Sequence, residues 1–350
     1  MTLTAKTNRD VTLRVGPFAK LPEVLTSLGY DPRPIFHECG FQLKRFQNVD
    51  SRIPYIQTSQ LITRCVEITG ASHLGILLAQ SALPSHLGLS GFLAQSAPTV
   101  EEALNCVVEN LDLHEEGGVV NLEKTSTHSI LSYNLLIAGV DAAEQVYDLA
   151  AGMMYRILQT LCGDSWQADS ISLTRRSPAD ISPYRQFFNT QVYFNATECA
   201  VTFSNDWLGA VPQGHDDLLH QHLAEEANAL HESQNHNLMD ALPACLYKAL
   251  MAGQFSSEEV AARLGMHERT LHRRLKEAGT SFRYQLDKAR FALGRQLLGS
   301  TSLPVCDIAA TLGYSDSSGF IRAFQRWCGT SPAAWRGQFR AAKENSREAS

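Results

Sequence analysis

The stretch that decides the fold runs from residue 260 to residue 281 and reads VAARLGMHERTLHRRLKEAGTS. A near copy, IAATLGYSDSSGFIRAFQRWCGTS, occupies residues 308–331. The two copies begin in register at an offset of 48 residues. The second copy gains one residue in the turn, so that Leu271 matches Phe320, and one more before its last glycine. Such small slips indicate one structural unit used twice.

Each copy has the pattern of a short helix, a glycine-containing turn and a longer helix, which is the layout of a helix-turn-helix. We place the two units at about residues 257–279 and 305–328. Residues typical of helix starts precede both units: Ser256, Ser257 and Thr301, the last followed by Pro304 in a first turn. Only helical patterns follow residue 240, so this part of the chain is predicted to be all-α.

The longer helix of each unit is predicted to have one apolar face and one polar face. In the first unit the apolar positions are Leu271, Leu275 and Ala278, and the opposite face carries Arg269, His272, Arg273 and Lys276. In the second unit the apolar positions are Phe320, Phe324 and Trp327, which leaves Ser317, Ser318, Arg322 and Arg326 largely outward.

An Arg-rich helix face suits the major groove of DNA, where arginine bonds guanine O6 and N7 together. Between the two units, residues 282–300 carry an apolar stripe at helix spacing: Leu286, Ala289, Leu293 and Leu297. A helix there, rising ~1.5 Å per residue, could hold the two polar faces about one DNA turn apart, roughly 34 Å. The alternative is that both helices are merely solvated amphipathic helices.

The charge of the chain is divided unevenly. Residues 241–350 contain 16 Lys and Arg against 9 Asp and Glu, a balance of +7, whereas residues 1–240 carry −13. A basic module on an acidic body indicates a polyanionic partner for that module.

Residues 241–342 resemble the DNA-binding domain of AraC/XylS-type transcription regulators, because both repeats and the connecting ARFALGRQLL stand in the expected order. The resemblance implies a seven-helix domain. The residues that it implies to face bases are Arg269, His272 and Arg273 in the first unit and Ser317, Ser318 and Arg322 in the second. Contacts to the DNA backbone are expected from Thr270, Arg274, Lys276 and Arg326. Gly319 inside the second recognition helix and Trp335 in place of the usual tyrosine depart from the family pattern, and the second unit is expected to grip phosphates more than to read bases.

The first 230 residues mix helical patterns, at 99–114 and 142–161, with short β-like runs, so an α+β domain around a small sheet is predicted. The β-like runs are 119–124, 129–136, 169–176 and 199–203. The amide-rich segment 231–240 is interpreted as a linker, and 343–350 as a disordered tail.

Residues 15–210 are similar to the arabinose-binding type of amino-terminal domain found in a subset of these regulators. The similarity lies in residues 50–80, 87–114 and 178–208, and it implies a domain that senses a small molecule and dimerises. The effector and its pocket stay open. Candidate side chains for holding an acid are Arg52, His86, Tyr133, Arg175 and Arg176, although surface pairing or core packing explains each of them equally well.

The sequence contains residues typical of two other kinds of site. The cluster His215, Asp216, Asp217, His220 and His222 has the donors of a divalent-metal site, but it fits a helix start with acidic residues near its positive end, and no metal or other cofactor is predicted. Eight cysteines without a Cys-x-x-Cys pair fit reduced thiols. Cys39, beside His37, carries the alternative of a thiol-based redox sensor or an enzyme domain fused to a DNA-binding tail.

The sequence therefore predicts a sequence-specific transcription regulator and not an enzyme. It would be an activator controlled by a small-molecule effector, with promoter DNA, RNA polymerase and a second copy of itself as partners. No apolar run of about 18 residues and no secretory signal is present, so the predicted location is the cytoplasm.

Overall fold

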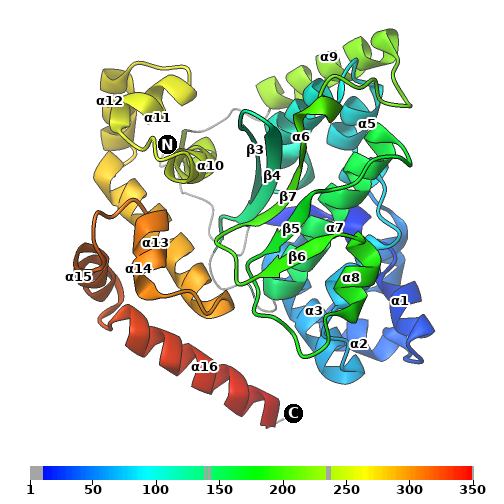
Figure 1. Cartoon of the computed structure of the whole chain (residues 1–350), viewed down its shortest axis with the longest axis horizontal. Coiled ribbons are helices and arrows are strands. Elements are labelled where there is room, and N and C mark those ends of the chain that lie inside the picture. The colour runs from blue at the N-terminus through cyan, green and yellow to red at the C-terminus, as the bar shows by residue number, and fades with distance from the viewer. Residues whose placement is uncertain (1–10, 138–139, 141–142, 234–237, 349–350) are drawn as a thin grey trace. The chain divides into compact units, whose positions relative to one another are not determined.

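The chain folds into two compact units, which are described separately (Figure 1). The amino-terminal unit contains residues 11–135 and 143–233, and the carboxy-terminal unit contains residues 238–348. The computed structural model describes residues 11–137, 140, 143–233 and 238–348.

The amino-terminal unit is an α+β domain, as predicted, with a five-stranded sheet in the order β3-β4-β7-β5-β6. Its pairs are antiparallel apart from β5 and β6, which run parallel. The strands are β3 (Gly118–Lys124), β4 (His128–Leu135), β5 (Ser170–Leu173), β6 (Gln191–Phe194) and β7 (Cys199–Ser204). A separate two-stranded sheet pairs β1 (Thr12–Arg14) with β2 (Arg52–Pro54). All four predicted β-like runs contain strands, and β1, β2 and β6 were not predicted.

The helices of this unit lie on one side of the sheet (Figure 1), where α7 packs against β4, β5 and β7. They are α1 (Leu21–Ser27), α2 (Pro32–Glu38), α3 (Tyr55–Thr69), α4 (Leu74–Ala79), α5 (Leu89–Ser96), α6 (Val100–His114), α7 (Ala143–Cys162), α8 (Ser182–Phe188) and α9 (Asp217–Ser233), with 3-10 turns η1 (Gly16–Phe18), η2 (Leu43–Gln47), η3 (Pro84–Leu87) and η4 (Asn205–Trp207). In α6, Thr99 caps the start by accepting from the Glu102 amide at 3.2 Å. The buried positions Val100, Leu104, Val107 and Leu111 then recur at helix spacing.

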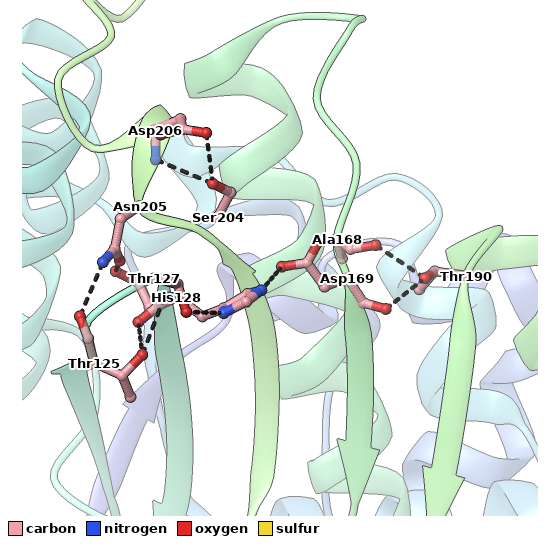
Figure 2. A network of polar contacts seen from close by, with 10 residues as sticks. Thr125, Thr127, His128, Ala168, Asp169, Thr190, Ser204, Asn205 and Asp206 are labelled. Atoms are coloured by element: carbon pink, nitrogen blue, oxygen red, sulfur yellow. Dashed lines mark hydrogen bonds and ion pairs between the residues drawn. The ribbon is translucent and has the colours of Figure 1, made fainter.

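One end of the sheet is tied together by a polar network (Figure 2). His128 at the start of β4 places Nε2 3.5 Å from a carboxylate oxygen of Asp169, just before β5. Asn205, after β7, donates to the carbonyl of Thr125 in the β3–β4 turn at 2.9 Å, and Thr190 before β6 donates to the Ala168 carbonyl at 2.9 Å. These bonds join the ends of all five strands.

The carboxy-terminal unit is all-α over the residues that the structure describes, as predicted. Its helices are α10 (Leu238–Met251), α11 (Ser257–Arg263), α12 (Glu268–Glu277), α13 (Phe282–Ser300), α14 (Val305–Thr311), α15 (Ser317–Cys328) and α16 (Pro332–Glu348). The helix pairs α11/α12 and α14/α15 are the two repeated units. The stripe of α13 is buried at Leu286, Leu293 and Leu297, and Ala289 packs against the core beside it.

The core of the carboxy-terminal unit changes character along the chain. Around the first repeat it is largely aliphatic, built by Leu242, Leu246, Val260, Leu271, Leu275 and their neighbours. Around the second repeat it is aromatic: Phe324 lies 5.4 to 6.2 Å, centroid to centroid, from the rings of Phe291, Phe320 and Trp335. Edge-on and tilted ring pairs of this kind add attraction beyond the area they bury.

Several predicted details of the helix ends differ from the structure. Ser256 alone caps α11, in a capping box with Glu259, and Ser257 is the first helical residue. Thr301 ends α13 instead of starting the next helix, because its hydroxyl donates back to the Leu297 carbonyl at 2.6 Å. The N-cap of α14 is Pro304.

The segments predicted to be a linker and a tail also differ. Helix α9 continues to Ser233 and α10 begins at Leu238, so helix covers both ends of 231–240, and 234–237 lie outside the described residues. Helix α16 continues to Glu348, over most of the predicted tail. The reason is local: Ala, Lys, Glu and Arg in this stretch are good helix formers, and no proline or glycine interrupts residues 338–348.

Candidate nucleic-acid interface and the amino-terminal site residues

The turns of the two repeats share their backbone geometry. Gly265 and Gly313 follow the first helix of each unit with φ of 63° and 74°, and Gly279 and Gly329 follow the second helix with φ of 72° and 78°. These left-handed conformations strain a residue with a Cβ, which is why glycine recurs at both pairs of positions. The duplication in the sequence is therefore a duplication of turn geometry.

Helix α12 has a buried face and a cationic face, as its pattern predicts. Leu271 and Leu275 are fully buried. Arg269, His272, Arg273 and Lys276 are exposed, and at 3.6 residues per turn they share the opposite side. Of the predicted backbone-contacting residues, Arg274 is exposed on the flank of this face and Thr270 is half-buried. Ala278, predicted to be apolar core, is instead exposed, since it is the C-cap where the helix ends.

Two acidic side chains lie close to polar side chains on the exposed face of α12. Glu268 in the first turn accepts from Ser257 of α11, and its Oε1 lies 3.6 Å from His272 Nε2. Glu277 lies 3.8 Å from Arg273 Nε, with both side chains about two-thirds exposed. Exposed pairs of this kind contribute little to stability, so Arg273 can leave Glu277 for a stronger anion at small cost.

Helix α15 presents a less charged surface. Asp316 caps it by accepting from the Gly319 amide at 2.8 Å, which places Gly319 in the first turn and not in the helix interior, where it would be most costly. Ser318 and Arg322 are exposed, whereas Ser317 is half-buried at the edge of the apolar face. Arg326 is exposed but forms an ion pair with Asp287 of α13 at 3.0 Å.

One exposed polar residue of α15 was missed. Gln325 stands seven residues after Ser318, on the same side of the helix, and is exposed. The signal was present in the sequence, since i and i+7 positions share a helix face.

Arg290 of α13 lies between the two repeats. Its guanidinium is 4.8 Å from the ring centroid of Phe255, just before α11, and 4.9 Å from that of Tyr314, in the second turn. Its Nε also donates to the Leu312 carbonyl at 2.9 Å. A cation between two ring faces attracts both, so Arg290 joins the entrance of the first unit to the turn of the second.

In the amino-terminal unit, most of the candidate acid-holding side chains have protein partners. Arg52 donates to Thr12 Oγ1 at 2.8 Å and to the Leu113 carbonyl at 3.1 Å. Arg175 pairs with the buried carboxylate of Asp148, and His86 Nδ1 accepts from the Leu83 amide at 3.4 Å. Of these candidates, Tyr133 lines a buried cavity, described below.

The histidine cluster around residue 215 is divided among separate contacts. The Nδ1 atoms of His215 and His220 each lie 3.2 Å from an oxygen of Ser96, and His222 is 3.9 Å from Glu225. Over the residues that the structure describes, no group of three or more His, Cys, Asp or Glu side chains is arranged to hold a metal ion.

Several cysteines of the amino-terminal unit, Cys39 among them, have the opposite of the environment that a reactive thiol needs. Burial, with a smaller contribution from Glu38, raises the pKa of Cys39. Burial likewise raises the pKa of Cys106 to about 11 and those of Cys65 and Cys162 to about 12. A redox-active cysteine requires a lowered pKa, so these findings give no support to a thiol-based sensor.

The fold and the two cationic helix-turn-helix units define a DNA-binding regulator with a separate α+β domain. Comparisons with known proteins agree. Residues 29–210 match the family described as the arabinose-binding domain of AraC transcription regulators, N-terminal, and residues 260–338 match a helix-turn-helix domain family. The chain belongs to the AraC family of transcription regulators that carry this amino-terminal domain.

Several relatives extend along nearly the whole chain. An ornithine utilization regulator of Pseudomonas aeruginosa is 24% identical over 90% of this chain and 94% of its own length. The regulator VirS of Mycobacterium tuberculosis is 24% identical over 90% and 93%. The crystal structure of the regulator CdpR from Pseudomonas aeruginosa covers 92% of this chain and 98% of its own at 23% identity, with a TM-score of 0.47. Over the described residues, no helix is long and apolar enough to cross a membrane.

Proposed function

We propose that this regulator recognises a specific DNA sequence mainly through α12, and that a small-molecule effector bound by the amino-terminal unit changes how it engages its promoter. The observation that carries the proposal is the exposed face of Arg269, His272 and Arg273, set opposite the fully buried Leu271 and Leu275. In this arrangement the packed side fixes the helix, and the cationic side is free to enter a major groove.

The second unit makes a smaller contribution to base recognition in this proposal. Ser318, Arg322 and Gln325 form its outward surface, while Ser317 is half-buried and Arg326 is paired with Asp287. Arg322 and Arg326 would hold phosphates together with Thr270, Arg274 and Lys276 of α12. Helix α13, with 19 residues and ~1.5 Å of rise per residue, spans about 28 Å, which is of the order of one DNA turn.

Control by an effector requires that the effector has different affinities for different arrangements of the protein. The effector has to bind one arrangement of the protein more tightly than another in order to change DNA binding. We also propose that the protein is an activator that contacts RNA polymerase and acts as a homodimer. Light scattering of the purified chain tests the dimer, and transcription in vitro with purified polymerase tests activation.

The experiment for DNA recognition is a selection of genomic DNA fragments bound by the purified full-length protein, repeated at several salt concentrations. The expected result is a narrow set of sites, each holding one strongly preferred motif and, about one helical turn away, a second motif with a weaker preference. Binding to all fragments alike, with only the salt dependence of phosphate contacts, would contradict sequence-specific recognition.

A further inference from the structure

The amino-terminal unit contains a cavity in its core, between β3 and β4 on one side and α6 and α7 on the other. Its volume is about 60 Å³, several times the ~10–15 Å³ that one water molecule needs. The walls are mostly apolar and include Leu111, Val120, Val146, Leu149, Met153 and Met154. Two methionines give part of this wall unbranched, adaptable side chains, which can adjust to guests of different shape.

A polar cluster lies at one end of this cavity. Tyr133 of β4 donates to Glu115 Oε2 at 3.2 Å, and its hydroxyl oxygen is 3.1 Å from that of Tyr55 at the start of α3. Tyr55 also forms a side-chain hydrogen bond with Glu115, as Tyr133 does, and both bonds lower the pKa of this carboxyl group. Two tyrosine hydroxyls and one carboxyl group therefore meet at this end of the cavity, and the oxygens of all three can accept a hydrogen bond.

The backbone is shaped to admit this cluster. A Cβ at Gly118 would lie 2.5 Å from the ring of Tyr133 and 2.7 Å from Glu115 Oε1. No real Cβ approaches other atoms so closely, so a side chain at position 118 would displace both residues. Glycine at the start of β3 thus makes the space in which Tyr133 and Glu115 meet.

A fourth polar group, with one ring nitrogen that lacks a hydrogen-bond partner, lines the same cavity. His114, the last residue of α6, is only 4% exposed, and its Nδ1 has no hydrogen-bond partner. Burial lowers the pKa of His114 to about 3, with Arg14, Arg52 and His86 acting in the same direction, so the ring is neutral. An unpartnered polar atom in a protein core costs free energy, and a ligand that bonds to it would recover that cost.

The carboxyl group at the polar end of the cavity disfavours an anionic guest. Glu115 is the carboxyl group at its polar end, and burial raises the pKa of this group to about 7 against the opposing effects of Tyr133, Tyr55 and Arg52. Arg52 is held outside by Thr12 and Leu113. A second hollow, of about 560 Å³ beside Tyr155 and Arg156, is wider and more polar and has no comparable buried cluster.

We infer that this cavity is the effector site, and that the effector is a small, mostly apolar molecule whose polar head, an ammonium or a hydroxyl, donates a hydrogen bond to Glu115 and lies within reach of Tyr55 and His114. The inference rests on the proposed function, in which the amino-terminal unit binds an effector. The inferred ligand differs from the acid considered in the sequence analysis, because the group at the polar end of the cavity, Glu115, is itself an acid.

The test uses three probes that share one apolar chain and differ in the head: butylamine, butanol and butyrate. Binding to the full-length protein is measured by titration calorimetry at pH 7. Butylamine and butanol are expected to bind, the amine more tightly, and butyrate is not. The variant Glu115→Gln should weaken butylamine at least about tenfold, the loss of one charge-assisted hydrogen bond. The variant Glu123→Gln makes the same change on the exposed part of β3 and should leave binding unchanged.

A measurement of thermal stability shows whether the Glu115→Gln variant is folded. Because the folded pKa of Glu115 is raised, its contribution to stability is complete below pH 4.5 and is lost as pH rises towards 7. Glu115→Gln should therefore unfold at a higher temperature than the wild type at pH 8, with little difference at pH 5. Tyr133→Phe provides a second variant, in which the amine should also bind more weakly.

Two results would overturn the inference: butyrate binding as tightly as butylamine, or butylamine binding that Glu115→Gln leaves unchanged in a folded protein. The proposed function fails in a different way. If the amine binds through Glu115 but no ligand of this class changes the affinity for operator DNA, measured by fluorescence anisotropy, the cavity's ligand class stands and effector control does not.

Discussion

The two helix-turn-helix units have the same turns but different interiors and different surfaces. The first packs aliphatic side chains such as Leu271 and Leu275 and presents a cationic helix face. The second packs the rings around Phe324 and presents Ser318, Arg322 and Gln325. The positive-φ glycines are kept in both. The two copies therefore share the turn geometry that defines a helix-turn-helix unit. Their exposed residues differ, which allows the two copies to have different roles in DNA binding.

The largest effects are expected from the two cores. Phe324→Ala should reduce the free energy of unfolding of the carboxy-terminal unit by about 3–5 kcal/mol, and Leu271→Ala by about 2–5 kcal/mol, because each leaves a cavity at a fully buried position. Urea unfolding followed by tryptophan fluorescence measures both, since Trp327 and Trp335 lie in this unit. A loss below about 1 kcal/mol for Phe324→Ala would show that the aromatic core collapses around the gap.

A smaller effect is expected where the two units meet. Arg290→Met removes the cation between Phe255 and Tyr314 and should cost about 1–2 kcal/mol. Arg295→Met is the matched control, because Arg295 lies over Phe291 of the same helix and over Trp335 of α16. We expect Arg290→Met, unlike the control, to weaken binding to DNA with two motifs more than to DNA with one. Equal losses on both DNAs would mean that Arg290 does not hold the two units in register.

The smallest effects are expected from the helix caps. Ser256→Ala and Asp316→Ala each remove a side chain that caps the first or the second unit, and each should cost about 1 kcal/mol. Thermal unfolding of the two variants compares them directly. An unequal result, with Asp316→Ala near zero, would indicate that the first turn of α15 is already held by packing of Gly319 beside Tyr314.

Much of this fold is predictable from the sequence because strong periodic patterns carry it. The apolar stripe of α13 specifies its buried face, and the repeat specifies both helix-turn-helix units. The helix ends are less predictable, since Thr301 and Ser257 have the residue type of an N-cap at positions where neighbouring bonds decide otherwise. Short strands such as β6 give too few residues for a pattern.

The cavity could not be predicted from the sequence, for a different reason. Tyr55, Glu115 and Tyr133 come from three separate elements, and only the tertiary fold brings them together. Glu115 also follows a helix in a run of acidic residues, where a surface position is the ordinary expectation. Candidates such as Arg52 and Arg175 drew attention by their charge, but their charge is satisfied within the protein.

The central claim is that α12 reads bases while α15 mainly holds phosphates. The most direct test compares the full-length wild type with Arg273→Ala and Arg322→Ala, by selecting bound sequences from a random DNA pool and measuring affinity against salt. Arg33→Ala, which removes an exposed arginine from the amino-terminal unit, is the control. The account predicts that Arg273→Ala costs about 1–3 kcal/mol and relaxes the preference at one or two bases, whereas Arg322→Ala weakens all sequences alike and lowers the salt slope by about 1. The reverse pattern, with base preference lost in Arg322→Ala and kept in Arg273→Ala, would contradict it.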